Sequence, residues 1–172
     1  MAFNFVEYFR RIATSLKDIA HIPATPKFHR VSGVMALEEF LQNQIITNPV
    51  DGFQLIVEDN HDSRFVYNSA TLLDEQYYVF YVLKRCDVND FDAIEAAKSG
   101  AKQVSKKILS KLFRDKHTDT INQSKHGLKV FDKGSVRNQT IGPLADQYWG
   151  VLCSFILSDK PGIEYNPDDW TD

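Results

Sequence analysis

Two amphipathic helices are predicted near the start of the chain. Between Asn4 and Ala20 the apolar residues recur at spacings of three and four, which places them on one side of a helix. This stripe consists of Val6, Phe9, Ile12, Ala13, Leu16 and Ile19. The two prolines of "HIPATPKFH" interrupt the pattern. A shorter helix over Val34–Ile45 follows and ends before "TNPVDG". Its predicted apolar face consists of Val34, Leu37, Phe40, Leu41 and Ile45.

Strand patterns replace the helical period after Gly52. "FQLIVED" (Phe53–Asp59) alternates between two faces, "NHDS" has the composition of a turn, and "RFVYN" (Arg64–Asn68) reads as a short return strand. We expect these two strands to form a β-hairpin with each other. The next strand, Glu75–Arg85, is apolar on both faces. That pattern is typical of a strand at the centre of a sheet or beneath an oligomer interface.

The longest predicted element is a helix from Ala93 to about Lys116. At about 1.5 Å per residue, a helix of this length can cross a whole sheet. Small residues around Gly100 indicate close packing on the sheet or on a neighbour, although glycine costs about 1 kcal/mol against alanine inside a helix. The apolar stripe consists of Ile94, Ala97, Ala101, Val104, Ile108 and Leu112.

The last third of the domain is predicted to be a polar loop followed by strands. "HTDTINQSKHG" is loop-like, and "LKVFDKGS" and "VRNQTIGPL" form two short strands around a turn at Lys133 and Gly134. "DQYWGVLCSFILSD" is a long strand with Trp149, Val151, Cys153, Phe155 and Leu157 on one face. Together the elements predict an α+β fold with a mixed or mainly antiparallel sheet, an N-terminal helix, a short second helix and one long helix packed across the sheet.

Composition sets the domain organisation. Among the 172 residues 43% are apolar, which suits a single domain over residues 1–159. Residues 160–172 have too few apolar side chains to fold on themselves and are expected to be an exposed arm. The formal net charge of -3 gives no global field that would recruit nucleic acid. Cys86 and Cys153 follow no metal spacing and predict buried thiols in a reducing compartment.

No targeting segment is expected from the sequence. The opening residues "MAFNFVEYFRR" lack the basic and apolar regions of a secretion signal. No apolar run approaches the roughly 18 residues that a membrane-spanning helix needs. We therefore expect no membrane partner.

Four carboxylates in "RCDVNDFDAIEAAKSG" are the strongest candidates for chemistry. Asp90 suits the N-cap of the long helix, and Asp92 and Glu95 in its first turns would complement the helix dipole. The alternative is a divalent-metal site of a small nucleic-acid-acting enzyme using Asp87, Asp90 and Asp92, which would need further ligands such as His61 and Asp62. The remaining histidines pair at no metal spacing, and the sequence has neither a G-x-S-x-G motif nor a phosphate-cradling glycine loop, so we expect no cofactor.

Two other groups of residues are candidates for interaction. Lys98, Lys102 and Lys106 lie four apart and line one face of the long helix. They form either a solvated face or a surface that meets DNA or an acidic partner. In the arm, Tyr165 and Trp170 are candidate anchors in a partner's pocket, or else fold back on their own domain.

The order of elements resembles the tail-terminator and head–tail joining proteins of tailed bacteriophages and prophages. The residues that carry the resemblance are "EQYYVFYVLKRCDVNDFDAIEAAKSGAKQVSKKIL", a strand running into a long crossing helix, and the late strand "GPLADQYWGVLCSFIL". The resemblance implies a non-enzymatic, ring-forming structural protein with other tail or neck proteins as partners. It also implies residence in the bacterial cytoplasm and then in the particle. The metal-dependent enzyme and an adaptor domain that binds an acidic partner remain the alternatives.

Overall fold

The predicted α+β fold is confirmed. The computed structural model describes residues 3–47, 50–60, 62–68, 71–121 and 126–160, which form three helices and a six-stranded mixed sheet. The elements in chain order are α1 (Phe5–Ser15), β1 (Phe28–Val31), α2 (Val34–Thr47), β2 (Phe53–Glu58), β3 (Ser63–Asn68), β4 (Thr71–Arg85), α3 (Phe91–Ile121), β5 (Phe131–Leu144) and β6 (Tyr148–Asp159). None of these helices has an apolar stretch long enough to cross a membrane.

The sheet is built around the long antiparallel pair β4 and β6. Strand order is β1-β2-β4-β6-β5, with β3 also paired to β4. β1 runs parallel to β2, and every other pairing is antiparallel. The β4–β6 register runs without a shift from Asp74 opposite Asp159 to Arg85 opposite Tyr148. The expectation that Glu75–Arg85 lies at the centre of the sheet is therefore confirmed.

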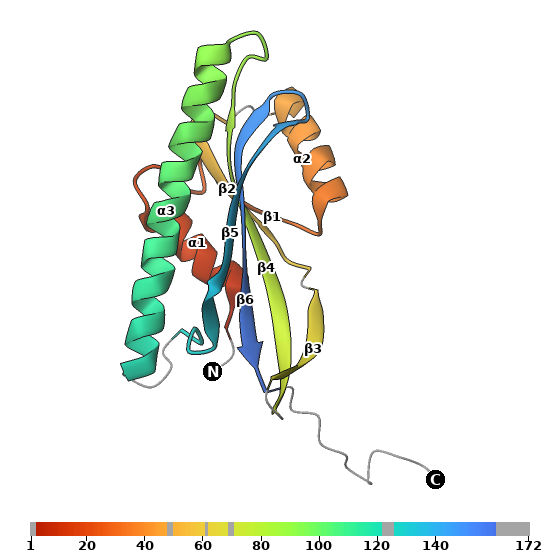
Figure 1. Cartoon of the computed structure of the whole chain (residues 1–172). Coiled ribbons are helices and arrows are strands. Elements are labelled where there is room, and N and C mark those ends of the chain that lie inside the picture. Colours follow the sequence, from red (N-terminus) through yellow and green to blue (C-terminus); the bar gives the residue numbers. More distant parts are fainter. Residues whose placement is uncertain (1–2, 48–49, 61, 69–70, 122–125, 161–172) are drawn as a thin grey trace.

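Helices cover the two faces of this sheet unequally. α3 and α1 pack on one face, where Tyr78, Phe80 and Val82 of β4 join the larger core cluster. α2 packs on the opposite face over Tyr81 and Leu83. Figure 1 shows that α3 runs along the sheet, whereas α2 lies over the end of the sheet that is remote from β3. The two-sided apolar pattern of β4 thus follows from a helix layer on each face.

Aromatic rings fill the core beneath α1. The ring of Phe5 lies 4.8 Å from that of Tyr78, and Phe9 lies 4.9 Å from Phe80, centroid to centroid. Tyr78 stacks on its cross-strand neighbour Phe155 at 5.5 Å. Such pairs contribute roughly 0.5–1.5 kcal/mol each beyond the burial of their area.

α3 packs closely on the sheet, as predicted. The whole predicted stripe of this helix is buried. Gly100 faces Phe53 of β2, and a Cβ atom at Gly100 would lie 2.5 Å from the tip of that ring. The glycine therefore permits a close approach between helix and sheet that an alanine would disturb.

The predicted hairpin between Phe53–Asp59 and Arg64–Asn68 is wrong. Both strands instead pair with the same edge of β4, where β3 faces Thr71–Gln76 and β2 faces Phe80–Lys84. β3 turns directly into β4, with Asn68 opposite Thr71. The partner of β3 is therefore set by the connection that follows it rather than by the one that precedes it. β4 is long enough to pair with β2 and β3 end to end along one edge.

Three boundaries also differ from the expectation. α1 ends at Ser15 rather than Ala20, because Thr14 and Ser15 donate their hydroxyls to carbonyls four residues earlier and Leu16 turns extended. α3 continues to Ile121, through the first five of the eleven residues expected to be a loop. The two late strands form one strand, β5, with a register shift between Asp132 and Arg137.

One residue of the second predicted helix lies off its expected face. Leu37 and Leu41 of α2 are buried, and Phe40 and Ile45 pack partly against the same cluster. Val34 is exposed, because at the first position of the helix it projects beyond the sheet contact.

Among the described strands, only β4 and β6 run along the whole length of the sheet without a register shift. At the level where Tyr78 pairs with Phe155, the ladder on one side passes from β2 to β3. On the other side β5 shifts register at the same level. We call this level the waist, and we call the part of the sheet beyond it, which contains β3, the distal half.

Gly150 of β6 is required by the backbone of β4. A Cβ atom at this position would lie 2.0 Å from the carbonyl oxygen of Val82. We expect Gly150→Ala to lower the free energy of unfolding by more than about 3 kcal/mol, because backbone rather than a flexible side chain must move. Urea unfolding measures the loss. Ser154→Ala, on the same face of β6, should cost under about 1 kcal/mol, and equal losses in the two variants would contradict the prediction.

His29 of β1 gives the stability a defined pH dependence. Its ring lies half-buried 4.7 Å from that of Phe40, and burial lowers its pKa to about 4. In the unfolded chain histidine titrates near about 6.5. Between these values the unfolded state binds a proton that the folded state does not. The free energy of unfolding should therefore fall, by about 1–3 kcal/mol, as the pH drops from about 6.5 to about 4.

The control for this pH dependence is His29→Gln, which has no titrating ring. Urea titrations at several pH values should show the wild type losing more stability than His29→Gln across that window. The two should run in parallel above it. Parallel curves throughout would contradict a depressed pKa for His29.

Candidate assembly surface

The acidic cluster begins α3, and the N-cap interpretation of Asp90 is confirmed. The amide of Ala93 donates to Oδ1 of Asp90 at 2.9 Å. Asp87 accepts the amide of Asn89 at 2.9 Å in the preceding turn. Asp92 lies exposed in the first turn, where it complements the helix dipole.

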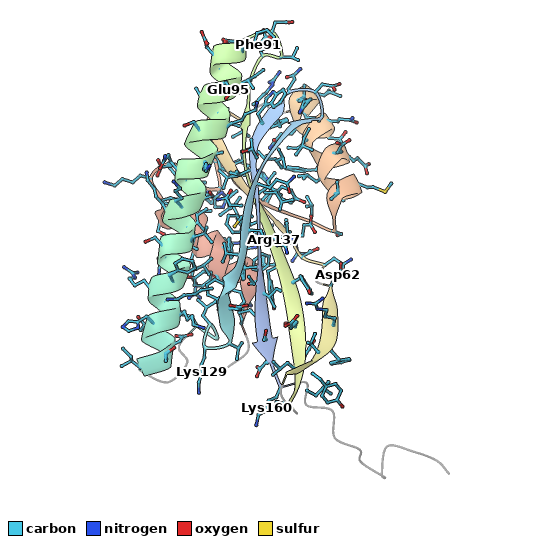
Figure 2. All side chains as sticks on the ribbon, viewed as in Figure 1. Asp62, Phe91, Glu95, Lys129, Arg137 and Lys160 are labelled. Carbon is cyan, nitrogen blue, oxygen red and sulfur yellow. The ribbon has the colours of Figure 1, made fainter. Side chains whose placement is uncertain are left out.

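Among the described residues, none of the further ligands that a metal site would need is brought to this cluster. Asp62 lies beside β3, far from the start of α3 at Phe91 (Figure 2). His61 lies outside the described residues. Across the described ranges, no three His, Cys, Asp or Glu side chains are grouped so that they could hold a metal ion.

Most of the positive charge of α3 is engaged within the domain. Lys107 forms an ion pair with Asp18 at 2.8 Å, and Lys111 and Arg114 both contact Asp115. Lys116 donates to the carbonyls of Lys129 and Phe131. Lys107 and Lys116 therefore tie α3 to other parts of the domain, whereas Lys111 and Arg114 are neutralised within α3.

Asp115 was not singled out from the sequence, and it is the polar link between α3 and α1. It is 3% exposed and accepts the hydroxyl of Tyr8 at 2.8 Å. Burial alone would raise the pKa of this carboxyl, but the bonds from Lys111 and Tyr8 outweigh burial and lower it. A carboxylate at neutral pH therefore holds the two helices together. Its spacing of four from Lys111 is the signal that could have indicated the pair.

Lys98, Lys102 and Lys106 do not act as one group. Nζ of Lys98 donates to Glu95 at 2.8 Å and lies 5.0 Å from the ring centroid of Trp149. Lys102 and Lys106 are exposed and form no ion pair with any described residue. The positive charge of this face that no carboxylate neutralises is therefore that of Lys102 and Lys106, in the middle of α3.

β5 extends this positive surface. Nδ2 of Asn138 donates to Oγ of Ser105 at 2.6 Å, which ties the strand to the middle of α3. Lys133 lies over the ring of Phe113 at 5.3 Å, and Arg137 is exposed on the strand (Figure 2). We call the set Lys102, Lys106, Lys133 and Arg137 the basic edge.

The hairpin β3–β4 in the distal half of the sheet carries apolar side chains on both faces, and those on one face are exposed. Phe65 and Tyr67 of β3 are 58% and 77% exposed. On the opposite face Val66, Leu73 and Tyr77 are half-buried and belong to none of the core clusters of the described residues. Figure 1 shows α2 ending before this region. Sequence reasoning missed it because it paired β3 with the wrong strand.

A polar depression lies where β4 leads into α3. It has a volume of about 420 Å³ and is lined by Asp51, Arg85, Cys86, Asp87, Val88 and Gln147. Arg85 donates to the side chain of Gln147 at 2.6 Å. Burial raises the pKa of the Cys86 thiol and raises that of Cys153 to about 12. Both thiols are therefore protonated at neutral pH and are weak nucleophiles.

Tyr165 and Trp170, the predicted anchors of the arm, lie outside the described residues. The arm follows β6, whose last residue Asp159 pairs with Asp74 in the distal half. Its point of departure is therefore next to the exposed side chains of the hairpin β3–β4.

Comparison with protein-family models and with curated proteins finds no match for this chain.

The structural role of Asp90 gives a direct test. Asp90→Ala should lower the free energy of unfolding by about 1 kcal/mol, because the amide of Ala93 loses its acceptor. Asp92→Ala is the matched control and should cost less, about 0.3–1 kcal/mol, since it loses only a dipole interaction. Calorimetry showing tight Mg²⁺ binding in the wild type that disappears in Asp90→Ala would instead support the metal-site alternative.

Proposed function

We propose that this protein is a non-enzymatic structural protein that assembles with copies of itself into a ring in a phage-like particle. Its place there is that of a tail-terminator or of a component that joins tail and neck. The observation that carries the proposal is the hairpin β3–β4 in the distal half of the sheet, where Phe65 and Tyr67 are exposed on one face and Val66, Leu73 and Tyr77 are half-buried on the other.

The exposure of this region argues for a partner. A hairpin with one apolar face can pack on its own domain, whereas one with two apolar faces needs cover on both sides. Exposed, contiguous apolar surface on a folded domain marks an interaction site. Phe65 and Tyr67 supply the rigid aromatic side chains that dominate the energetics of many interfaces.

The resemblance to tail-terminator and head–tail joining proteins supports the phage-like setting. It rests on the aromatic strand β4 leading into the long helix α3 and on the late strand β6. In this setting the partners are further copies of the chain and other tail or neck proteins, with DNA passing near the basic edge. The protein would be made in the bacterial cytoplasm and become part of the particle. Tyr165 and Trp170 of the arm would anchor in a neighbouring subunit.

Light scattering after size-exclusion chromatography tests the proposal. We expect the wild type to form a discrete multimer of the 19.7 kDa chain that electron microscopy resolves as a ring. Phe65→Ser combined with Tyr67→Ser should reduce its mass, because the apolar contact is lost. Removal of residues 160–172 should weaken assembly without changing the melting temperature.

The matched control is Ile46→Ser on α2, which removes an apolar side chain of similar exposure away from the hairpin. It should leave the multimer intact. A wild type that stays monomeric at every concentration would overturn the proposal. A truncated chain that assembles normally but melts earlier would place the arm in the fold of its own domain.

A further inference from the structure

β5 presents an open edge with unpaired positive charge. It pairs with β6, and no described strand pairs with its other side. Between its two register shifts, Arg137–Ile141 is a regular stretch of strand. Arg137 at the start of this stretch and Lys133 just before it are exposed. Neither has an ion-pair partner within the described part of the chain. The basic edge therefore combines free backbone groups with free cations.

β3 presents an open edge of the opposite character. It pairs with β4, and its other side is free of described residues. The single cation of the strand, Arg64, is neutralised by Glu75 at 2.9 Å. Asp62 at its start is exposed and forms no ion pair with any described residue. We call Asp62, Phe65 and Tyr67 the acidic edge.

Contacts between identical edges are disfavoured by these charges. Two β5 strands side by side would bring Lys133 and Arg137 of both copies together, which is the arrangement that charged edge strands use to avoid pairing. Two β3 strands would gain no charge attraction, because Asp62 is negative in both copies and Arg64 is already neutralised by Glu75. Opposite edges match in charge and also in length, since β3 has six residues and Arg137–Ile141 has five.

We propose that copies of this protein join head to tail, with the basic edge of one copy paired to the acidic edge of the next so that the sheet continues from subunit to subunit. The proposal rests on the proposed function, because it names the contact through which the copies assemble. A contact between two different edges is heterologous, so it generates a ring where the rotation closes and a filament where it does not. The exposed side chains of Phe65 and Tyr67 would then lie at the boundary between subunits.

Charge reversal at the two edges tests the contact. The β5 variant carries Lys133→Glu and Arg137→Glu, and the β3 variant carries Asp62→Lys and Tyr67→Lys. All four side chains are exposed, so both variants should fold, as circular dichroism will show. By light scattering each variant alone should be reduced to the mass of a monomer.

An equal mixture of the two variants should regain assembly. The unaltered β5 of one variant then meets the unaltered β3 of the other, and the two altered edges also carry opposite charges. Native mass spectrometry should find the two chains in equal numbers. Glu38→Lys with Glu39→Lys, two exposed positions on α2, is the matched control and should leave the assembly unchanged. Raising salt from about 0.1 M to about 1 M should shift the wild type toward monomer.

The possible failures are distinguishable. If the wild type assembles and the β5 variant assembles equally well, the edge contact is wrong while the proposed function stands. If the wild type remains monomeric at every concentration, both are overturned. If a variant does not fold, hydrogen exchange on the wild type tests whether the two edges pair. Residues 63–68 and 137–141 should become protected together as concentration rises, and protection confined to other segments would overturn the contact.

Discussion

The pairing of β4 with β6 is the constraint from which the rest of the structure follows. Their ladder joins residues far apart in the sequence, and it holds without a shift from Asp74 to Arg85. Both strands are apolar on both faces, so the pair must be covered by α1 and α3 on one side and by α2 on the other. Gly150 allows the two backbones to approach closely near Val82. The outer strands β2, β3 and β5 then add to the edges that this pair leaves open.

The unequal reach of the helices divides the sheet into two functional parts. Where both layers are present, the sheet is buried. The carboxylate of Asp115 on α3 holds α3 to α1 within the layer on one face. Past the waist, strands continue without a second layer, and aromatic side chains are exposed. Buried and exposed apolar surface are thereby separated along a single pair of strands. The carboxylates at the start of α3 belong to the first part, because they cap the N-terminus of a helix that covers the sheet.

Sequence periodicity was sufficient to predict the elements whose position is determined by neighbouring residues in the sequence. The stripe of α3, the N-cap at Asp90 and the central position of β4 all follow from the spacing of apolar and capping residues, and the structure confirms them. The partner of β3 could not be derived in this way, because two turns flank the strand and the choice between them depends on the length of β4. The bulge that joins the two halves of β5 likewise depends on its pairing with β6.

Only part of the candidate site was predicted, because the rest depends on contacts between residues far apart in the sequence. Lys102 and Lys106 were recognised from their helical spacing, but their association with Lys133 and Arg137 requires the packing of β5 beside α3. The partial neutralisation of the other lysines depends on residues such as Asp18, which lies far away in the sequence. Phe65 and Tyr67 were identified as strand residues, and they form a surface because no described helix covers the hairpin β3–β4.

The waist has a mechanical consequence. A wide sheet resists bending because many parallel ladders must deform together, yet at Tyr78 and Phe155 the flanking ladders change strand or register and β4 and β6 alone pass through. Bending stiffness at this level therefore comes largely from the rings of Phe5, Tyr78 and Phe155, which pack across it. Side-chain contacts deform over a range of angles at lower cost than hydrogen bonds break. Tilting of the distal half against the helical body would consequently need no strand to lose its partner, and in the proposed assembly such tilting would adjust the curvature.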